Sequence, residues 1–168
     1  MPTFGSKSRE RLATVQAPLV IILERAIVHF DFTVLTGRRG PEDQAEAVRL
    51  KRSKAQWPDS AHNCAVEVPG VPRRFWKEDT RALSRAVDVA PWPIDWGNEG
   101  SASRRAEAIS RFAFLNGLLK GIAAEMGIEI RQGHDWDGDG VLNSRDPDSS
   151  GFMDWPHTEL VKASPWRL

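Results

Sequence analysis

Two histidines and two aspartates are spaced so that they could build one catalytic metal site. His62 follows a polar loop, Asp88 lies inside an apolar segment, and His157 comes three residues after Asp154 near the end of the chain. A catalytic zinc ion takes three protein ligands and keeps a fourth position for water, whose proton a neighbouring base must accept. The sequence therefore predicts that the two histidines and Asp88 bind Zn²⁺, with Asp154 as the base.

Asp88 is the member of this set whose surroundings suit an unpaired charge least. It stands between Val87 and Val89 in an otherwise apolar run that is typical of a buried strand. Moving a carboxylate out of water is unfavourable unless the charge is paired or bound to a metal. We therefore expect Asp88 to have a cationic partner.

An acidic, glycine-rich stretch later in the chain has the spacing of a calcium-binding loop. Asp135, Asp137 and Asp139 take its first, third and fifth positions, Asn143 the ninth and Asp146 the twelfth. Alternating oxygen ligands around a tight turn are what calcium requires, although the twelfth ligand is normally a glutamate that offers two oxygens. The prediction is a Ca²⁺ site, and the alternative is an acidic surface loop.

Composition excludes several classes of protein. The 168 residues carry 23 Lys and Arg against 23 Asp and Glu, which argues against a nucleic-acid binder. The single cysteine, Cys64, excludes an internal disulfide and a cysteine-ligated zinc site.

The N-terminus lacks the apolar core of a signal peptide, and the run 19–23 is too short to span a bilayer. We expect a chain made in the cytoplasm, without membrane insertion.

Apolar spacing predicts helices and strands that do not alternate regularly. Helices are expected at 9–28, where Pro18 restarts the helix, and at 41–52, 77–83 and 103–126. Strands are expected at 30–35, 85–90, 128–131 and around His157. This order favours an α+β fold, a single domain over residues 1–168 in which helices flank a small central antiparallel sheet.

Five short segments, in the same order along the chain, resemble the zinc D,D-/L,D-peptidases of the VanY and VanX type. The resemblance is strongest to their bacteriophage branch, the L-alanyl-D-glutamate endolysins, and it implies the hedgehog-like fold of D-Ala-D-Ala peptidases. The matching segments are Thr36–Gly40 with Gln44, Trp57–Asn63, Ser84–Trp96, Gly133–Gly140 and Asp154–Leu160.

This resemblance implies a role for each matching polar residue. The two histidines and Asp88 take the zinc-ligand positions, and Asp154 takes that of the base, which activates water and later passes the proton to the leaving amine. Arg39 takes the position that holds the substrate carbonyl or its developing oxyanion. Ser60 and Gln44 belong to the same motifs and are expected to support substrate binding.

The sequence departs from the resembled family between the first two ligands. Relatives place them within one short segment, whereas residues 63–87 separate His62 from Asp88 here. We interpret residues 64–83 as an insertion. A loop tolerates an insertion when the two ends of the inserted segment stay close together. Glu67 is the alternative carboxylate ligand, but the segment that follows Asp88 also matches the family and favours Asp88.

The resemblance implies a phage endolysin that hydrolyses the L-alanyl-D-glutamate bond of peptidoglycan stem peptides for host lysis. It would act as a monomer on the periplasmic cell wall after holin-type release. Alternatives are a D-Ala-D-Ala carboxypeptidase with the same site, a non-catalytic cell-wall-binding module and a calcium-binding interaction protein. In the insertion, Arg73, Arg74 and Trp76 would suit an anionic glycan polymer, and a solvated loop is the alternative.

Overall fold

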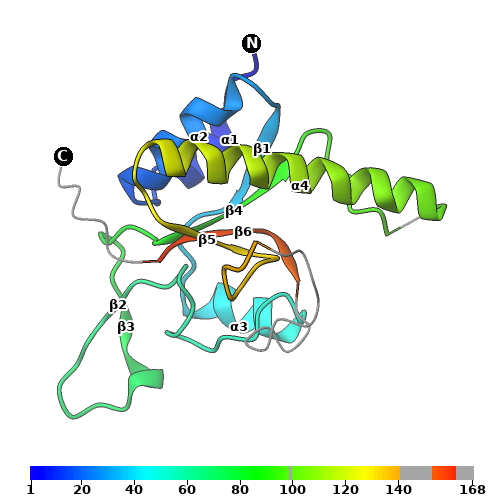
Figure 1. Cartoon of the computed structure of the whole chain (residues 1–168). Helices are drawn as coiled ribbons and strands as arrows, with labels where there is room; N and C mark the ends of the chain where they lie inside the picture. Colours follow the sequence, from blue (N-terminus) through cyan, green and yellow to red (C-terminus); the bar gives the residue numbers. More distant parts are fainter. Residues whose placement is uncertain (99, 141–152, 162–168) are drawn as a thin grey trace.

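The computed structural model describes residues 1–98, 100–140 and 153–161, and its centre is a four-stranded antiparallel sheet (Figure 1). The strands lie in the order β1-β4-β6-β5, and every neighbouring pair is antiparallel. Their bounds are β1 Phe32–Thr36, β4 Ala86–Pro91, β6 Asp154–Leu160 and β5 Ile130–Gly133. The predicted α+β fold with a central antiparallel sheet is confirmed.

Helices lie on both sides of this sheet. Helices α1 (Ser6–Leu12), α2 (Ala17–Ile27) and α4 (Ala102–Glu125) lie on one side, and α3 (Pro41–Arg49) lies on the other (Figure 1). The apolar core fills the space between the sheet and helices α1, α2 and α4. Within the described part of the chain, no helix is long and apolar enough to cross a membrane.

The alternation of side chains along the strands separates the core from the opposite face. Val87 and Val89 of β4 belong to the apolar core, so Asp88 between them points to the other face. Asp88 is paired in register with His157 of β6. Glu159, two residues further along β6, shares the face of His157. Polar side chains from two neighbouring strands thus meet on the sheet face away from α4.

The predicted first helix is two helices in the structure. Pro18 lies in the first turn of α2, where its missing N–H is no loss, and Gln16 before it is extended. The Gln16 N–H donates to the carbonyl oxygen of Ser84, 2.9 Å away, which ties the connection between the helices to the start of β4. The predicted long helix 103–126 is confirmed as α4, and Gly127 follows it with a φ of 66°.

The helix predicted at 77–83 is wrong. Lys77–Glu78 instead form strand β3, which pairs with β2 (Ala65–Val66). The Asp79 N–H also donates to the Cys64 carbonyl oxygen at 2.8 Å, and Glu78 pairs with Arg38 at 3.0 Å. Bonds to distant parts of the chain therefore take the place of the local bonds that a helix would make.

Gly37 allows the loop after β1 to lie directly against the end of α1. A Cβ atom there would lie 2.3 Å from Thr14 Oγ1 and 2.5 Å from the Arg11 carbonyl oxygen. The carbonyl oxygen of Gly37 accepts a hydrogen bond from Nδ1 of His62 at 2.7 Å. This close approach therefore also fixes the position of one predicted metal ligand.

We expect Gly37→Ala to lower the free energy of unfolding by about 1–3 kcal/mol, because backbone atoms must move to admit the methyl group. Gly117→Ala is the control: this exposed residue of α4 has nothing within 4 Å of its added Cβ. The control should raise stability by up to about 1 kcal/mol through helix propensity. Chemical unfolding measures both, and equal midpoints for Gly37→Ala and the parent would contradict the packing argument.

Candidate active site

Three side chains bring one donor atom each to a common point on the polar face of the sheet. Nε2 of His62 lies 3.0 Å from Oδ1 of Asp88 and 3.2 Å from Nδ1 of His157. The third side of this triangle, from His157 Nδ1 to Asp88 Oδ1, is 3.2 Å. Ligand atoms about 3.3 Å apart surround a tetrahedral metal whose bonds are about 2.0–2.1 Å long. The triangle therefore has the size of a zinc site.

In each imidazole ring, the nitrogen that faces away from the common point makes a hydrogen bond. This bond determines which nitrogen carries the proton and which has a free lone pair. His62 Nδ1 donates to the carbonyl oxygen of Gly37, and His157 Nε2 donates to Oε2 of Glu159 at 3.2 Å. In the neutral rings, the other two nitrogens then carry lone pairs. Both point at each other and at a carboxylate oxygen, an arrangement that repels unless a cation lies between them. The donor set and its tautomers thus fit a divalent metal.

The pKa of His157 also shows that the site favours a positive charge. Burial lowers the pKa of His157, but hydrogen bonds to Asp88 and Glu159 raise it, and the resulting pKa is about 9. For Asp88, burial raises the pKa, but the two histidines bring it well below its ordinary value. Without a metal, a proton on His157 takes the place of the cation. Metal binding would displace that proton.

Glu159 holds the His157 ring from behind. It is 3% exposed and accepts from Nε of Arg131 at 3.0 Å, across the register between β6 and β5. Burial raises the pKa of Glu159, but its hydrogen bonds to His157 and Arg131 lower it to about 2. Trp136 packs against the histidine ring, with 5.2 Å between the two ring centroids. The ring is therefore fixed by an ionised acceptor and by packing.

A pocket of about 340 Å³ opens over the three donor atoms. Asp154 lies in its wall together with His62, Asp88 and His157. Burial raises the pKa of Asp154 to about 7, and the charge of Asp88 adds to this rise. A cation bound at the donor atoms would lower the pKa again. Asp154 is thus a partly buried carboxylate beside the donor triangle, which is where a base for an attacking water must lie.

Gly133 of β5 permits the tight packing of strands at this point. A Cβ atom there would lie 2.5 Å from the carbonyl oxygen of Asp154 and 2.9 Å from Cβ of His157. Any other residue would push β5 away from the start of β6. Both the carboxylate and the second histidine are therefore positioned by a contact that only glycine allows.

Arg39 connects the donor triangle to the protein beneath it. One guanidinium nitrogen donates to Oδ2 of Asp88 at 3.1 Å, so Oδ1 remains free for the triangle. Another donates to Oε1 of Gln44 at 3.2 Å, which also accepts from the Asn63 side chain. Arg39 lines the pocket and is 12% exposed, so it can reach a substrate there.

The structure places the two predicted substrate-binding residues differently. Ser60 lines the pocket, and its Oγ accepts from the backbone N–H of His62 at 3.3 Å. Gln44 is 0% exposed, and its amide nitrogen donates to Ser53 Oγ and to the Ala55 carbonyl oxygen. The expectation that Gln44 contacts substrate is therefore corrected: its amide is fully occupied by the protein and holds Arg39.

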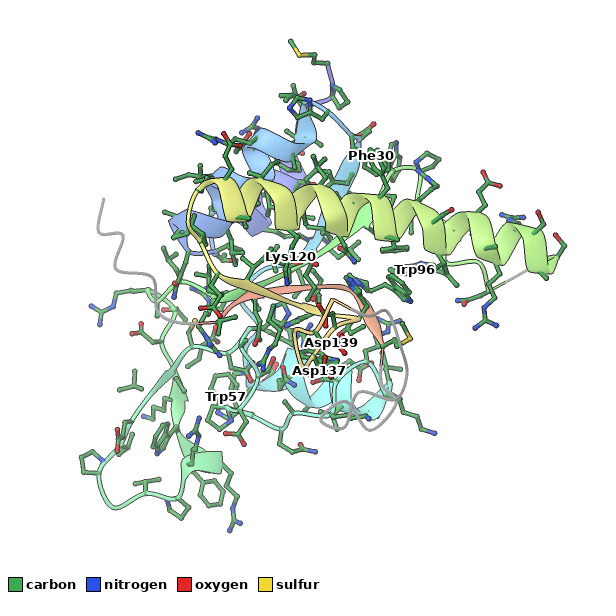
Figure 2. All side chains as sticks on the ribbon, in the orientation of Figure 1. Phe30, Trp57, Trp96, Lys120, Asp137 and Asp139 are labelled. Atoms are coloured by element: carbon green, nitrogen blue, oxygen red, sulfur yellow. The ribbon has the colours of Figure 1, made fainter. Side chains whose placement is uncertain are left out.

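The structure also shows where the alternative zinc ligand and three of the predicted calcium ligands lie. Glu67 is exposed just after β2 and does not join the donor group. Carboxylate oxygens of Asp135, Asp137 and Asp139 lie within 4.8 Å of one another. Figure 2 labels two of these aspartates, Asp137 and Asp139. Asn143 and Asp146, the other predicted calcium ligands, lie outside the described residues.

Sequence reasoning did not assign a role to Glu159, Arg131 or Trp136. The alternation of side chains along a strand could have identified Glu159, because it follows His157 by two residues and so shares its face. Arg131 and Trp136 carry no comparable local signal. They reach the histidine only through the pairing of β5 with β6 and the turn after it.

Comparisons with known proteins point to one family of peptidases. The model of the family described as phage L-alanyl-D-glutamate peptidase matches residues 2–161. The L-alanyl-D-glutamate peptidase of Escherichia phage T5 is 25% identical over 163 residues, which is 94% of this chain and 97% of the relative. The crystal structure of the Serratia marcescens L-Ala D-Glu endopeptidase ChiX has the same fold. Its TM-score is 0.55 at 21% identity, over 94% of this chain and 89% of that one.

We expect Glu159→Ala to weaken metal binding by about 10–100-fold, because the His157 ring loses the acceptor that fixes its tautomer. Glu159→Gln should recover part of the affinity, since its amide oxygen still accepts. Glu129→Ala, at an exposed acid just before β5, is the control. Titration of metal-free protein against a competing chelator measures the affinity, and nitrogen NMR of the imidazoles reports the tautomer. Parent-like affinity and tautomer in Glu159→Ala would contradict this role.

Proposed function

The chain belongs to the phage L-alanyl-D-glutamate peptidase family, and we propose that its activity depends on Zn²⁺ held by His62, Asp88 and His157. The protein is a peptidase of peptidoglycan stem peptides that acts at the L-alanyl-D-glutamate bond, as an endolysin does. The observation that carries the zinc proposal is the donor triangle with sides of 3.0, 3.2 and 3.2 Å. Two imidazoles and a carboxylate, with room for water, make a catalytic rather than a structural zinc site.

Asp154 is proposed as the general base and acid of the hydrolysis. Bound Zn²⁺ would supply a Lewis acid that polarises the scissile carbonyl and makes water more acidic. Asp154 accepts the proton of the attacking water and then delivers it to the amine nitrogen as the C–N bond breaks. Its position in the pocket wall and its raised pKa support this role. A non-catalytic wall-binding module would have no use for such a carboxylate.

Arg39 is proposed to stabilise negative charge on the substrate carbonyl oxygen. Its guanidinium lines the pocket while it is held by Asp88 and Gln44 on the protein side. A donor that is already fixed in place gives up little order when charge develops. We assign Gln44 to the positioning of Arg39, and Ser60 to the loop that presents His62.

The surroundings in which the enzyme acts are also part of the proposal. We infer synthesis in the host cytoplasm, holin-type release and action on periplasmic peptidoglycan as a monomer. The net charge of zero and the family membership support a wall substrate rather than a nucleic acid. A D-Ala-D-Ala carboxypeptidase with the same donor triangle would differ only in the bond that it cuts, which product analysis distinguishes.

We expect the protein to split soluble stem peptides between L-Ala and D-Glu, and zinc chelation to abolish the cut. Asp154→Asn should keep the fold and the bound zinc but lose about 10²–10⁴-fold in rate, because the proton acceptor is gone. Asp43→Asn, at an exposed acid of α3, should behave as the parent. Mass spectrometry of the products and zinc analysis measure these outcomes. Release of a terminal D-Ala alone, or full activity in Asp154→Asn, would contradict the proposal.

Calcium is proposed as a second ion, held by the acidic loop after β5. Asp135 is 6% exposed, and its carboxylate accepts from the Gly140 N–H at 3.3 Å, which closes the turn. Oxygens from three aspartates converge there, as calcium requires. Trp136, between two of these aspartates, packs on His157 and lines the pocket. Calcium would thus order a wall of the active site.

We expect Ca²⁺ to raise activity, and Asp137→Asn with Asp139→Asn to abolish this response while zinc content stays unchanged. The reason is that the loop loses two of its charged ligands but none of the zinc donors. Peptide hydrolysis with and without a calcium-selective chelator measures the effect, with Asp43→Asn as the control. If the parent shows the same rate at all calcium concentrations, the loop has no regulatory role.

A further inference from the structure

Residues 64–78 form an arm that projects from the body of the protein (Figure 1). Strands β2 and β3 pair at its base, with Ala65 opposite Glu78 and Val66 opposite Lys77. Residues 67–76 extend beyond this pairing and include the short 3₁₀ helix Arg73–Phe75. Cys64 at the base of the arm is buried, but the main apolar cluster contains no residue of the arm. Beyond its base, the arm therefore adds surface to the protein without adding to the main apolar cluster.

The arm exposes apolar side chains that the fold does not need. Phe75 is 61% exposed, Val66 46% and Val71 38%. Exposed apolar side chains gathered on one projection are typical of a binding surface. These three side chains lie on an element that contributes nothing to the main apolar cluster.

Positive charge is concentrated at the same place. Arg73, Arg74 and Lys77 are exposed, and the acids of residues 64–78 are Glu67 and Glu78, which gives the arm a net charge of +1. The whole chain has a net charge of zero. The arm therefore presents a local positive field that favours a ligand with carboxylates.

The cations and rings of the arm are arranged in pairs. The guanidinium carbon of Arg74 lies 4.8 Å from the Phe75 ring centroid, and that of Arg73 lies 5.3 Å from the Trp76 ring. Such stacking holds each guanidinium group in place, and the edge N–H groups of Arg74 can still donate to carboxylates of a ligand. Aromatic faces beside charged edges suit a polymer of sugar rings that carries carboxylates.

Two contacts join the arm to the rim of the active site. Nε1 of Trp57 donates to the Trp76 carbonyl oxygen at 3.0 Å, and Figure 2 shows Trp57 where the arm meets the body. Nε of Arg73 pairs with Oδ1 of Asp59 at 2.9 Å. Asp59 and the next residue, Ser60, line the pocket. A polymer bound to the arm would therefore lie beside the pocket.

We propose that this arm is a second binding surface for peptidoglycan, which holds the sugar strand and free carboxylates of the polymer while the pocket engages a stem peptide. The inference rests on the proposed function for the identity of the polymer. Its own evidence is the exposed rings, the local positive charge and the link through Asp59. The arm gives the enzyme a preference for the assembled wall over free peptides, because two linked contacts bind more tightly than one.

Binding and cleavage can be tested separately. Asp154→Asn protein is mixed with purified insoluble peptidoglycan, which stays intact, and the protein left in solution is measured after centrifugation. In this background, Arg74→Ala with Phe75→Ala should raise the apparent Kd about tenfold or more, as loss of a central aromatic and arginine does. The control is Arg105→Ala with Phe114→Ala on α4, where Phe114 is 59% exposed, close to the 61% of Phe75. The control should bind as the parent does.

The outcomes distinguish this proposal from the proposed function. Binding should weaken with added salt in the parent and less so in the arm variant, since screening removes a charge contribution. In protein with Asp154 intact, the ratio of the rate on polymer to the rate on soluble peptide should fall about tenfold in the arm variant. Equal polymer binding by parent and arm variant overturns the inference. So does equally strong binding of the parent to anionic lipid vesicles. Failure to cut soluble peptide overturns the proposed function alone, since the binding assay does not depend on cleavage.

Discussion

The repulsion among two imidazole lone pairs and a carboxylate is the constraint on which the rest of the site depends. His62, Asp88 and His157 bring these groups within 3.2 Å of one another on one face of the sheet. In a neutral state this arrangement is unfavourable, so the site must take up a proton or a metal. The pKa of His157 is raised to about 9, so without a metal this ring holds the proton that the site requires.

The partners behind the donor atoms keep this unfavourable arrangement in place. Gly37 fixes the tautomer of His62, Glu159 fixes that of His157, and Arg39 occupies the second oxygen of Asp88. Each outer contact leaves one donor atom of its partner directed at the common point. A site prepared in this way loses little order when a metal binds.

Local sequence patterns were informative where local forces decide the structure. Pro18 indicated the restart of a helix, and Gly127 the end of another, because backbone conformation at these residues depends on their own chemistry. The segment 77–83 was predicted as a helix and is not one. There, bonds to Cys64 and Arg38, both distant in sequence, override a weak helical preference. The full burial of Gln44 could not be predicted from a local sequence pattern either.

By itself, the sequence determined the α+β class, the family resemblance and the residue types that could bind a metal, because composition, alternation and motif order are properties of the chain. Only the tertiary structure decided that these groups meet. Asp88 lies opposite His157 because β4 pairs with β6 in one register, and Arg131 reaches Glu159 because β5 pairs on the other side. Register depends on how whole strands pack, and a shift of one residue would turn every one of these side chains to the opposite face.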